Sequence, residues 1–196
     1  MSQISNLTHQ DISETRAMFS RLKEVAKLGG WEERHARLWM NADMIRAYLY
    51  SFEIVGSGNS FIKAYVDDAL ARFFHTIDLL EGKTSGKVLE IGGNPYLFTI
   101  LLKKLCDFEI TPTNFFSLSV YDKKVGKGQQ KVRSTLFDEE YTFDYLTLNV
   151  ELSDYPFKDE TFDTIFFCEV LEHIVVDPLN CFDKLRRALR PGGSLC

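Results

Sequence analysis

The stretch Lys87-Val88-Leu89-Glu90-Ile91-Gly92-Gly93-Asn94-Pro95 decides the fold of this chain. Val88 to Ile91 is short, aliphatic and bounded by turn residues, which predicts a buried strand. Gly92 and Gly93 permit backbone turns that a side chain would forbid, and Pro95 suits the first position of a helix. We expect a corner whose unpaired N–H groups and positive helix dipole face whatever lies above the sheet.

Three further motifs follow this corner along the chain. They are Pro156-Phe157-Lys158-Asp159-Glu160-Thr161-Phe162-Asp163, Glu169-Val170-Leu171-Glu172-His173 and Leu189-Arg190-Pro191-Gly192-Gly193. Together with Val-Leu-Glu-Ile-Gly-Gly, they resemble the motifs of class I S-adenosylmethionine-dependent methyltransferases over residues 87–196. The resemblance implies an α/β, doubly wound and mostly parallel sheet that binds S-adenosyl-L-methionine and transfers its methyl group.

Composition limits the class of protein. The 196 residues are 45% hydrophobic, enough for one substantial core, and the formal charge of -5 gives no general attraction to nucleic acid or anionic membranes. No apolar run approaches the roughly 18 residues that span a bilayer, and the chain opens on polar residues that do not resemble a targeting segment. The four cysteines, Cys106, Cys168, Cys181 and Cys196, have no C-x-x-C spacing. We therefore expect reduced thiols in a soluble, cytoplasmic protein of unspecified oligomeric state.

The first 82 residues predict a helical N-terminal cap, and residues 83–196 the cofactor-binding domain. Apolar periodicity predicts helices over 12–28, 33–52 and about 60–80, the third with Asn59 or Ser60 as N-cap. In the family that the chain resembles, such helices commonly cover the pocket and help to choose the substrate. Ordinary packing of Trp31, Trp39, Tyr48 and Tyr50 explains the same aromatic pattern.

The order of the later elements predicts where the cofactor binds. A crossover helix is expected over 95–106 and strands over 108–111, 143–149 and 162–168. The resemblance implies cofactor contacts at the ends of these strands, with Asn114 near the ribose, the segment from Asn149 to Glu151 near the adenine and Cys168 near the sulfonium. The full set implied to bind the cofactor is Glu90, Gly92, Gly93, Asn94, Pro95, Asn114, Asn149, Val150, Glu151 and Cys168.

Residues 115–141 predict an insertion in place of a crossover helix. Residues 117–121 and 130–136 alternate like two strands, with a hairpin tip over 123–129. Basic side chains gather here, namely Lys123, Lys124, Lys127, Lys131 and Arg133. They could hold an anionic substrate or phosphate backbone, or they could be the solvated charges that commonly protect an edge strand.

Glu169, Glu172 and His173 have the spacing i, i+3, i+4, so a helical turn would bring them to one side. The pattern resembles the metal ligands of small-RNA 2′-O-methyltransferases, and it also occurs in ubiquinone-biosynthesis O-methyltransferases. It predicts a divalent-metal site, with Glu169 or His173 as catalytic base for a hydroxyl acceptor. The alternative is that the acids favour a helix N-terminus and that His173 supports them.

The chain ends at Ser194-Leu195-Cys196, where a fifth strand is expected to begin. We therefore expect a C-terminally truncated sheet that lacks its last strands and leaves the fourth strand as an unprotected edge. The predicted function is methyl transfer to a small-molecule or glycan hydroxyl. A metal-assisted RNA 2′-O-methyltransferase, a nicotinamide-dependent oxidoreductase and a non-catalytic interaction protein with this fold remain as alternatives.

Overall fold

The computed structural model describes residues 7–196 and divides them into two compact units. The first unit comprises the chain up to residue 84 with 95–107 and 131–142, and the second comprises 85–94, 108–130 and 143–196. Part of the polar opening of the chain, from which we expect no targeting segment, lies outside the described residues. Among residues 7–196, no helix combines the length and the apolar character needed to cross a bilayer.

The N-terminal helices begin at α1 (His9–Lys27). It starts three residues earlier than the apolar pattern predicts because Thr8 and Asp11 form a capping box, each side chain accepting the other's backbone N–H. The single helix expected over 33–52 is wrong, because α2 (Trp31–Met40) and α3 (Ala42–Tyr50) are separate helices. Asn41 divides them, since its side-chain amide donates to the carbonyl of Arg37 and ends α2.

A short strand, β1 (Glu53–Ile54), precedes α4 (Ile62–Asp78). The N-cap prediction for α4 is wrong, because Phe61 holds that position without a side-chain hydrogen bond. Asn59 instead closes the preceding loop: its side-chain oxygen accepts the N–H of Ile54 at 2.7 Å. Its side-chain oxygen is therefore used in the turn rather than at the helix.

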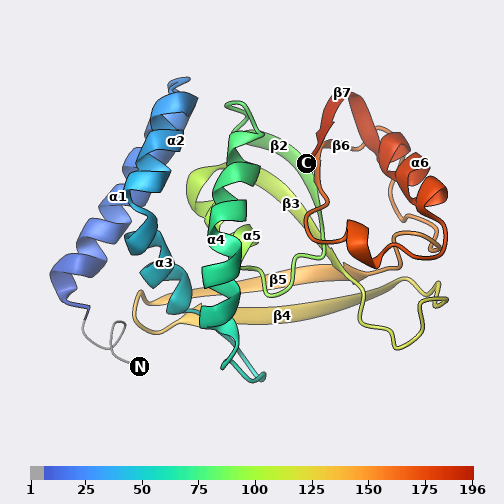
Figure 1. Cartoon of the computed structure of the whole chain (residues 1–196), viewed down its shortest axis with the longest axis horizontal. Coiled ribbons are helices and arrows are strands. Elements are labelled where there is room, and N and C mark those ends of the chain that lie inside the picture. The colour runs from blue at the N-terminus through green and yellow to red at the C-terminus, as the bar shows by residue number, and fades with distance from the viewer. Residues whose placement is uncertain (1–6) are drawn as a thin grey trace. The chain divides into compact units, whose positions relative to one another are not determined.

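Seven strands are hydrogen-bonded in the order β1-β4-β5-β3-β2-β6-β7 (Figure 1). The bounds are β2 (Ser85–Ile91), β3 (Asp107–Asn114), β4 (Gly126–Ser134), β5 (Glu139–Thr147), β6 (Phe162–Phe166) and β7 (Leu189–Leu195). β2 pairs with β6, β3 with β5 and β6 with β7, all parallel, whereas β1 and β4 pair antiparallel. The mostly parallel α/β sheet that we expected is confirmed.

The expected hairpin of residues 115–141 is shifted along the chain. Residues 117–121 form turns rather than a strand, because the hydroxyls of Ser117 and Ser119 accept the N–H groups two residues on. The connection between β4 and β5 is residues 135–138, where Asp138 has a φ of 51°. The predicted tip at 123–129 is therefore wrong, and Lys127 lies within β4.

The strand expected over 162–168 is β6, and the prediction that it is an unprotected edge is also wrong. β7 covers β6, with Phe162 opposite Leu189 and Ile165 opposite Leu195 (Figure 1). The register shifts between Phe162 and Thr164, and on the partner strand Gly192 adopts a φ of 78° that favours glycine. The Arg-Pro-Gly-Gly motif thus lies inside β7. This strand begins earlier than the one expected at residue 194.

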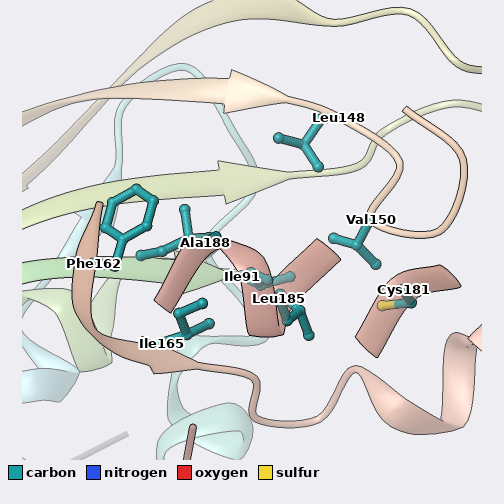
Figure 2. Close-up of a cluster of buried hydrophobic side chains, with 9 residues drawn as sticks. Ile91, Leu148, Val150, Phe162, Ile165, Cys181, Leu185 and Ala188 are labelled. Atoms are coloured by element: carbon teal, nitrogen blue, oxygen red, sulfur yellow. The ribbon is translucent and has the colours of Figure 1, made fainter. Parts of the chain in front are cut away.

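A buried cluster fixes the strands of the second unit against α6 (Pro178–Ala188) (Figure 2). It contains Leu89, Ile91, Leu148, Val150, Phe162, Ile165, Cys181, Leu185 and Ala188. Each large aliphatic or aromatic side chain of such a core contributes about 1.5–3 kcal/mol to folding. Asp177 caps α6 by accepting the N–H of Asn180. The cluster thus packs β2, β6 and the residues that follow β5 against α6.

Aromatic packing dominates the first unit. Tyr48 is buried, and its ring centroid lies 4.8 Å from Phe19, 5.1 Å from Phe52 and 4.9 Å from Phe137. Trp39 is partly exposed but contacts Phe74 with 5.1 Å between ring centroids. Core packing therefore accounts for Tyr48 and for much of Trp39.

Candidate functional site

A cavity of about 560 Å³ opens at the carboxyl ends of β2, β3, β5 and β6, in the second unit. Open parallel sheets bind ligands at this edge, and the volume lies within the usual range of small-molecule sites. We call it the carboxyl-edge cavity. Its walls are Ile91, Gly92, Thr113, Asn114, Phe115, Ser117, Val120, Leu148, Asn149, Val150, Glu151, Glu169, Val170, Glu172, His173, Ile174 and Val175.

The glycine corner supplies one wall but not the unpaired N–H groups that we expected. The N–H groups of Gly92 and Gly93 both donate to the carbonyl of Thr113, at 2.9 and 3.2 Å. The N–H of Asn94 donates to the side-chain oxygen of Asn114 at 3.0 Å. That expectation is wrong, because the end of β3 takes all three donors.

Gly92 is nevertheless required at this wall. Its φ is 74°, and a Cβ there would lie 3.2 Å from Cγ2 of Val170, in the segment after β6. Glycine therefore allows both the left-handed backbone and the close approach of the segment after β6.

Five of the ten predicted cofactor ligands lie outside the cavity lining. One is Cys168, and the other four belong to the corner, namely Glu90, Gly93, Asn94 and Pro95. Glu90 is buried beside Gly93, and a Cβ on that glycine would lie 3.3 Å from the carboxylate. The prediction that Pro95 begins the following helix is wrong, because α5 (Leu97–Leu105) starts two residues later. Its N-cap is Tyr96, which is in the left-handed conformation with a φ of 69°. These four residues shape the corner rather than line the cavity.

Asn149 organises the loop that follows β5. Its side-chain oxygen accepts the N–H groups of Glu151 and Leu152, and its amide nitrogen donates to the carbonyl of Val120 at 2.6 Å. Its own N–H donates to the hydroxyl of Ser153. The side chain predicted to read the adenine edge is thus largely engaged in a turn, and Asn149 holds the loop 150–153 to the segment around Val120.

Glu151 is a buried carboxylate that holds the segment before α6. One oxygen accepts the N–H groups of Val176 and Asp177 at 2.6 Å each, and the other accepts that of Val175 at 3.3 Å. Its backbone carbonyl accepts from the side chains of Asn180 and Lys184. Val150 lies beside it in the lining and also belongs to the buried cluster.

The residues after β6 do not form the expected helical turn. Glu169 has a φ of 55°, and only Leu171–His173 form a short 3-10 helix. Glu169, Glu172 and His173 still line one cavity, with 4.0 Å between His173 Nε2 and the Glu172 carboxylate. Within residues 7–196, no three His, Cys, Asp or Glu side chains are grouped closely enough to hold a metal ion. The geometry that the metal prediction needs is therefore missing.

Cys168 lies outside the lining, and its thiol faces the carbonyl of Cys196 with 3.9 Å between the two atoms. All four cysteines are free thiols, as expected. Sequence reasoning missed much of the lining, namely Thr113, Phe115, Ser117, Val120, Leu148, Val170, Ile174 and Val175. Thr113, Phe115, Leu148 and Val170 directly adjoin residues that we had selected, so extending each strand end by one residue would have found them.

The family follows from comparison with known proteins. A family model described as a methyltransferase domain matches residues 89–196, which is more than half of the chain. The chain belongs to this methyltransferase family. The class I, S-adenosylmethionine-dependent resemblance seen in the sequence motifs is confirmed.

Two relatives illustrate how far the likeness reaches. The methyltransferase chain is 28% identical over 177 residues to cycloartenol-C-24-methyltransferase 1 of Oryza sativa subsp. japonica, covering 84% of this chain and 47% of the relative. A solved structure from Methanococcus maripaludis, provisionally described as an S-adenosyl-L-methionine-dependent methyltransferase, is 17% identical with a TM-score of 0.40. The alignment covers 85% of this chain and 61% of that one. The methyltransferase chain thus spans about half the length of its curated relative.

The charge of the cavity fits the cofactor of this family. Glu151, Glu169 and Glu172 line it, and the described lining contains neither Lys nor Arg. Carboxylates attract a cation such as a sulfonium or an ammonium group, whereas a dinucleotide brings a pyrophosphate that they repel. The lining therefore suits S-adenosyl-L-methionine and opposes the nicotinamide alternative.

Proposed function

We propose that the chain binds S-adenosyl-L-methionine in the carboxyl-edge cavity and transfers its methyl group to a small-molecule acceptor. The observation that carries this proposal is a cavity at the ends of four strands, lined by three carboxylates and by neither Lys nor Arg among the described residues. Membership of the methyltransferase family supports the same chemistry.

When bound, the cofactor supplies a methyl carbon already activated by a positive sulfur, so the acceptor forms a bond to carbon as the carbon–sulfur bond breaks. The task of the protein is then to position the two reactants. Gly92 and Val170 approach each other closely where they line the cavity, and Asn114 lines it at the end of β3. We assign these residues and the segment from Asn149 to Glu151 to cofactor binding.

Glu169 and His173 are the proposed proton acceptors. Both line the cavity, and both are exposed, which leaves room for an acceptor beside them. A hydroxyl acceptor loses its proton as it gains the methyl group, and a carboxylate or a neutral imidazole can take that proton.

The acceptor is proposed as a small molecule. The name of the rice relative specifies cycloartenol, which is a small molecule, and the cavity wall is mostly apolar. A glycan hydroxyl remains the alternative from the sequence. Residues 1–82 are proposed to contribute to acceptor choice, and residues 83–196 to hold the cofactor.

A label-transfer experiment tests the proposal. The purified chain is incubated with S-adenosyl-L-methionine labelled in its methyl group and with a cell extract freed of endogenous cofactor. The products are separated into small molecules with lipids, glycans, RNA and protein. Ser117→Trp fills the cavity, and Ser119→Trp, two residues on and outside the lining, is the matched control.

We expect label in the small-molecule fraction with the wild-type chain and with Ser119→Trp, and a loss of at least about tenfold with Ser117→Trp. Label confined to RNA would overturn the acceptor class in favour of the RNA alternative. No transfer to any fraction would favour a non-catalytic protein with this fold.

A further inference from the structure

The loop of residues 115–125 connects β3 and β4 (Figure 1). It exposes an unusual number of apolar side chains. Leu118 is fully exposed, Tyr121 is 69% exposed and Phe116 is 55% exposed. Phe115, Val120 and Val125 are also among the exposed large hydrophobic residues. Single exposed apolar residues are ordinary, but six within eleven consecutive positions indicate an interaction surface. We call this segment the apolar loop.

The backbone of the apolar loop is held in place. The carbonyl of Val120 accepts the side-chain amide of Asn149, and the carbonyl of Lys123 accepts the hydroxyl of Ser153 at 3.1 Å. The hydroxyls of Ser117 and Ser119 each close a local turn. The side chains of Leu118 and Tyr121 are therefore exposed by a defined backbone.

Lysines accompany the apolar side chains. Lys123, Lys124 and Lys127 are exposed, and the one acid of the loop, Asp122, accepts the N–H of Lys124 at 3.0 Å. The other basic residues of this region have acidic partners: Lys131 lies 3.1 Å from Glu140, and Arg133 lies 2.5 Å from Glu53. Charges farther apart than a Debye length of about 8 Å are largely screened from each other. The net negative charge of the chain therefore does not cancel the attraction of these lysines for a nearby anionic surface.

We propose that the apolar loop docks on the surface of an anionic lipid bilayer. Aromatic and aliphatic side chains insert at the boundary between headgroups and acyl chains, and neighbouring lysines pair with anionic headgroups. Nucleic acid would use the lysines but gains nothing from an exposed Leu118. The same loop supplies Phe115, Ser117 and Val120 to the carboxyl-edge cavity, so docking places the cavity rim at the membrane.

Vesicle flotation tests the docking surface. The purified chain is mixed with vesicles of phosphatidylcholine alone, or of phosphatidylcholine with about one third phosphatidylserine, and the bound fraction is measured as lipid is increased. One variant, Leu118→Ser with Tyr121→Ser, removes apolar contact, and a second, Lys123→Ala with Lys124→Ala, removes charge. Matched controls are Leu28→Ser with Met40→Ser, and Lys83→Ala with Lys158→Ala, all at exposed positions outside the loop.

We expect binding to the anionic vesicles and weak binding to the neutral ones. Each lysine near the surface contributes about fivefold, so the lysine variant should lose roughly 25-fold in partitioning. The apolar variant should lose at least about tenfold, and the two controls should bind as the wild type does. Titration of S-adenosylhomocysteine into the same variants checks that the cavity is intact and keeps this result separate from the proposed function.

The proposal is overturned if the wild type does not float with either vesicle, or if the loop variants float as well as the controls. Self-association that Leu118→Ser with Tyr121→Ser abolishes, seen by sedimentation without vesicle binding, would instead assign the loop to contact between two copies of the chain.

Discussion

The buried carboxylate of Glu151 accepts the backbone N–H of Asp177 at 2.6 Å, which ties the loop after β5 to the N-cap of α6. The N–H groups of Val175 and Val176 donate to the same carboxylate. One side chain therefore sets the path of the segment that forms the rim of the carboxyl-edge cavity.

Glu151→Ala should cost about 3 kcal/mol in the free energy of unfolding, because it leaves three N–H groups of this segment without their acceptor. Glu151→Gln should cost less, since the amide keeps one acceptor oxygen. Urea titration followed by far-UV circular dichroism measures both losses. Equal stability of the wild type and the alanine variant would contradict the role given to Glu151.

Asp163 makes stability depend on pH in the acid range. The backbone N–H of Lys87, at 2.7 Å, holds the pKa of this carboxyl below its usual value of 3.8, and the guanidinium of Arg190 lowers the pKa further. Because the folded-state pKa is depressed, this stabilisation is present above the unfolded pKa and is lost as the pH falls through the folded one.

Asp163→Asn should therefore cost about 1 kcal/mol at pH 7, a figure reduced for the solvent screening of a partly exposed side chain. The difference from the wild type should shrink as the pH falls below about 4 and disappear once the pH is below the folded-state pKa. Chemical denaturation across this range measures it. A difference that is constant with pH would exclude the ionised carboxylate as its source.

Glu169 combines a strained backbone with a place in the cavity lining. Its φ of 55° is in the left-handed region, which costs a residue with a side chain about 1–3 kcal/mol. Glu169→Gly should relieve the strain, and we expect it to be more stable than Glu169→Ala by about 1 kcal/mol.

Both variants of Glu169 should lose label transfer, because both lack the carboxylate. Thermal unfolding gives the order of stability, and the transfer assay gives the activity. A glycine variant that is less stable than the alanine variant would show that the left-handed backbone is not strained.

In the first unit, three groups converge on Glu139. The hydroxyls of Tyr48 and Tyr141 donate to one carboxylate oxygen at 2.7 and 2.9 Å, and Lys104 donates to the other at 2.6 Å. Burial raises the pKa of Glu139, but these hydrogen bonds outweigh it and leave the pKa below its usual value.

Tyr48→Phe should cost about 1 kcal/mol, because it removes one hydrogen bond to a charged group but keeps the ring packing. Glu139→Leu should cost more, about 2–3 kcal/mol, because the buried Tyr48 hydroxyl and the Lys104 ammonium both lose their partner. Thermal denaturation of the two variants gives the order, and the reverse order would contradict this network.

The sequence predicted features that depend on local chemistry. The buried strand before Gly92 and the position of Asn149 to Glu151 at the end of a strand both follow from adjacent residues. It did not predict the outcome of competing local interactions. Serine hydroxyls turned residues 117–121 away from a strand, and Asn41 divided an otherwise continuous apolar pattern.

Other features depend on contacts distant in sequence. The carbonyl of Thr113, in β3, accepts the N–H groups of Gly92 and Gly93. The sequence of residues 87–95 gives no indication of this distant partner. Likewise, β7 forms because β6 offers a parallel edge to residues 189–195. The positive φ of Glu169 separates this residue from the turn that contains Glu172 and His173. The sequence does not indicate this conformation, because glutamate rarely adopts a positive φ.

The most direct test of the carboxylate-lined cavity is calorimetric titration of S-adenosylmethionine and of S-adenosylhomocysteine, whose sulfur is uncharged, into the wild-type chain and into Glu169→Gln with Glu172→Gln. We predict saturable binding of both ligands to one site on the wild type. Removing the two carboxylates should weaken S-adenosylmethionine at least about fivefold more than S-adenosylhomocysteine, because only the former carries the sulfonium charge. No binding of either ligand, or an equal loss for both, would contradict the account.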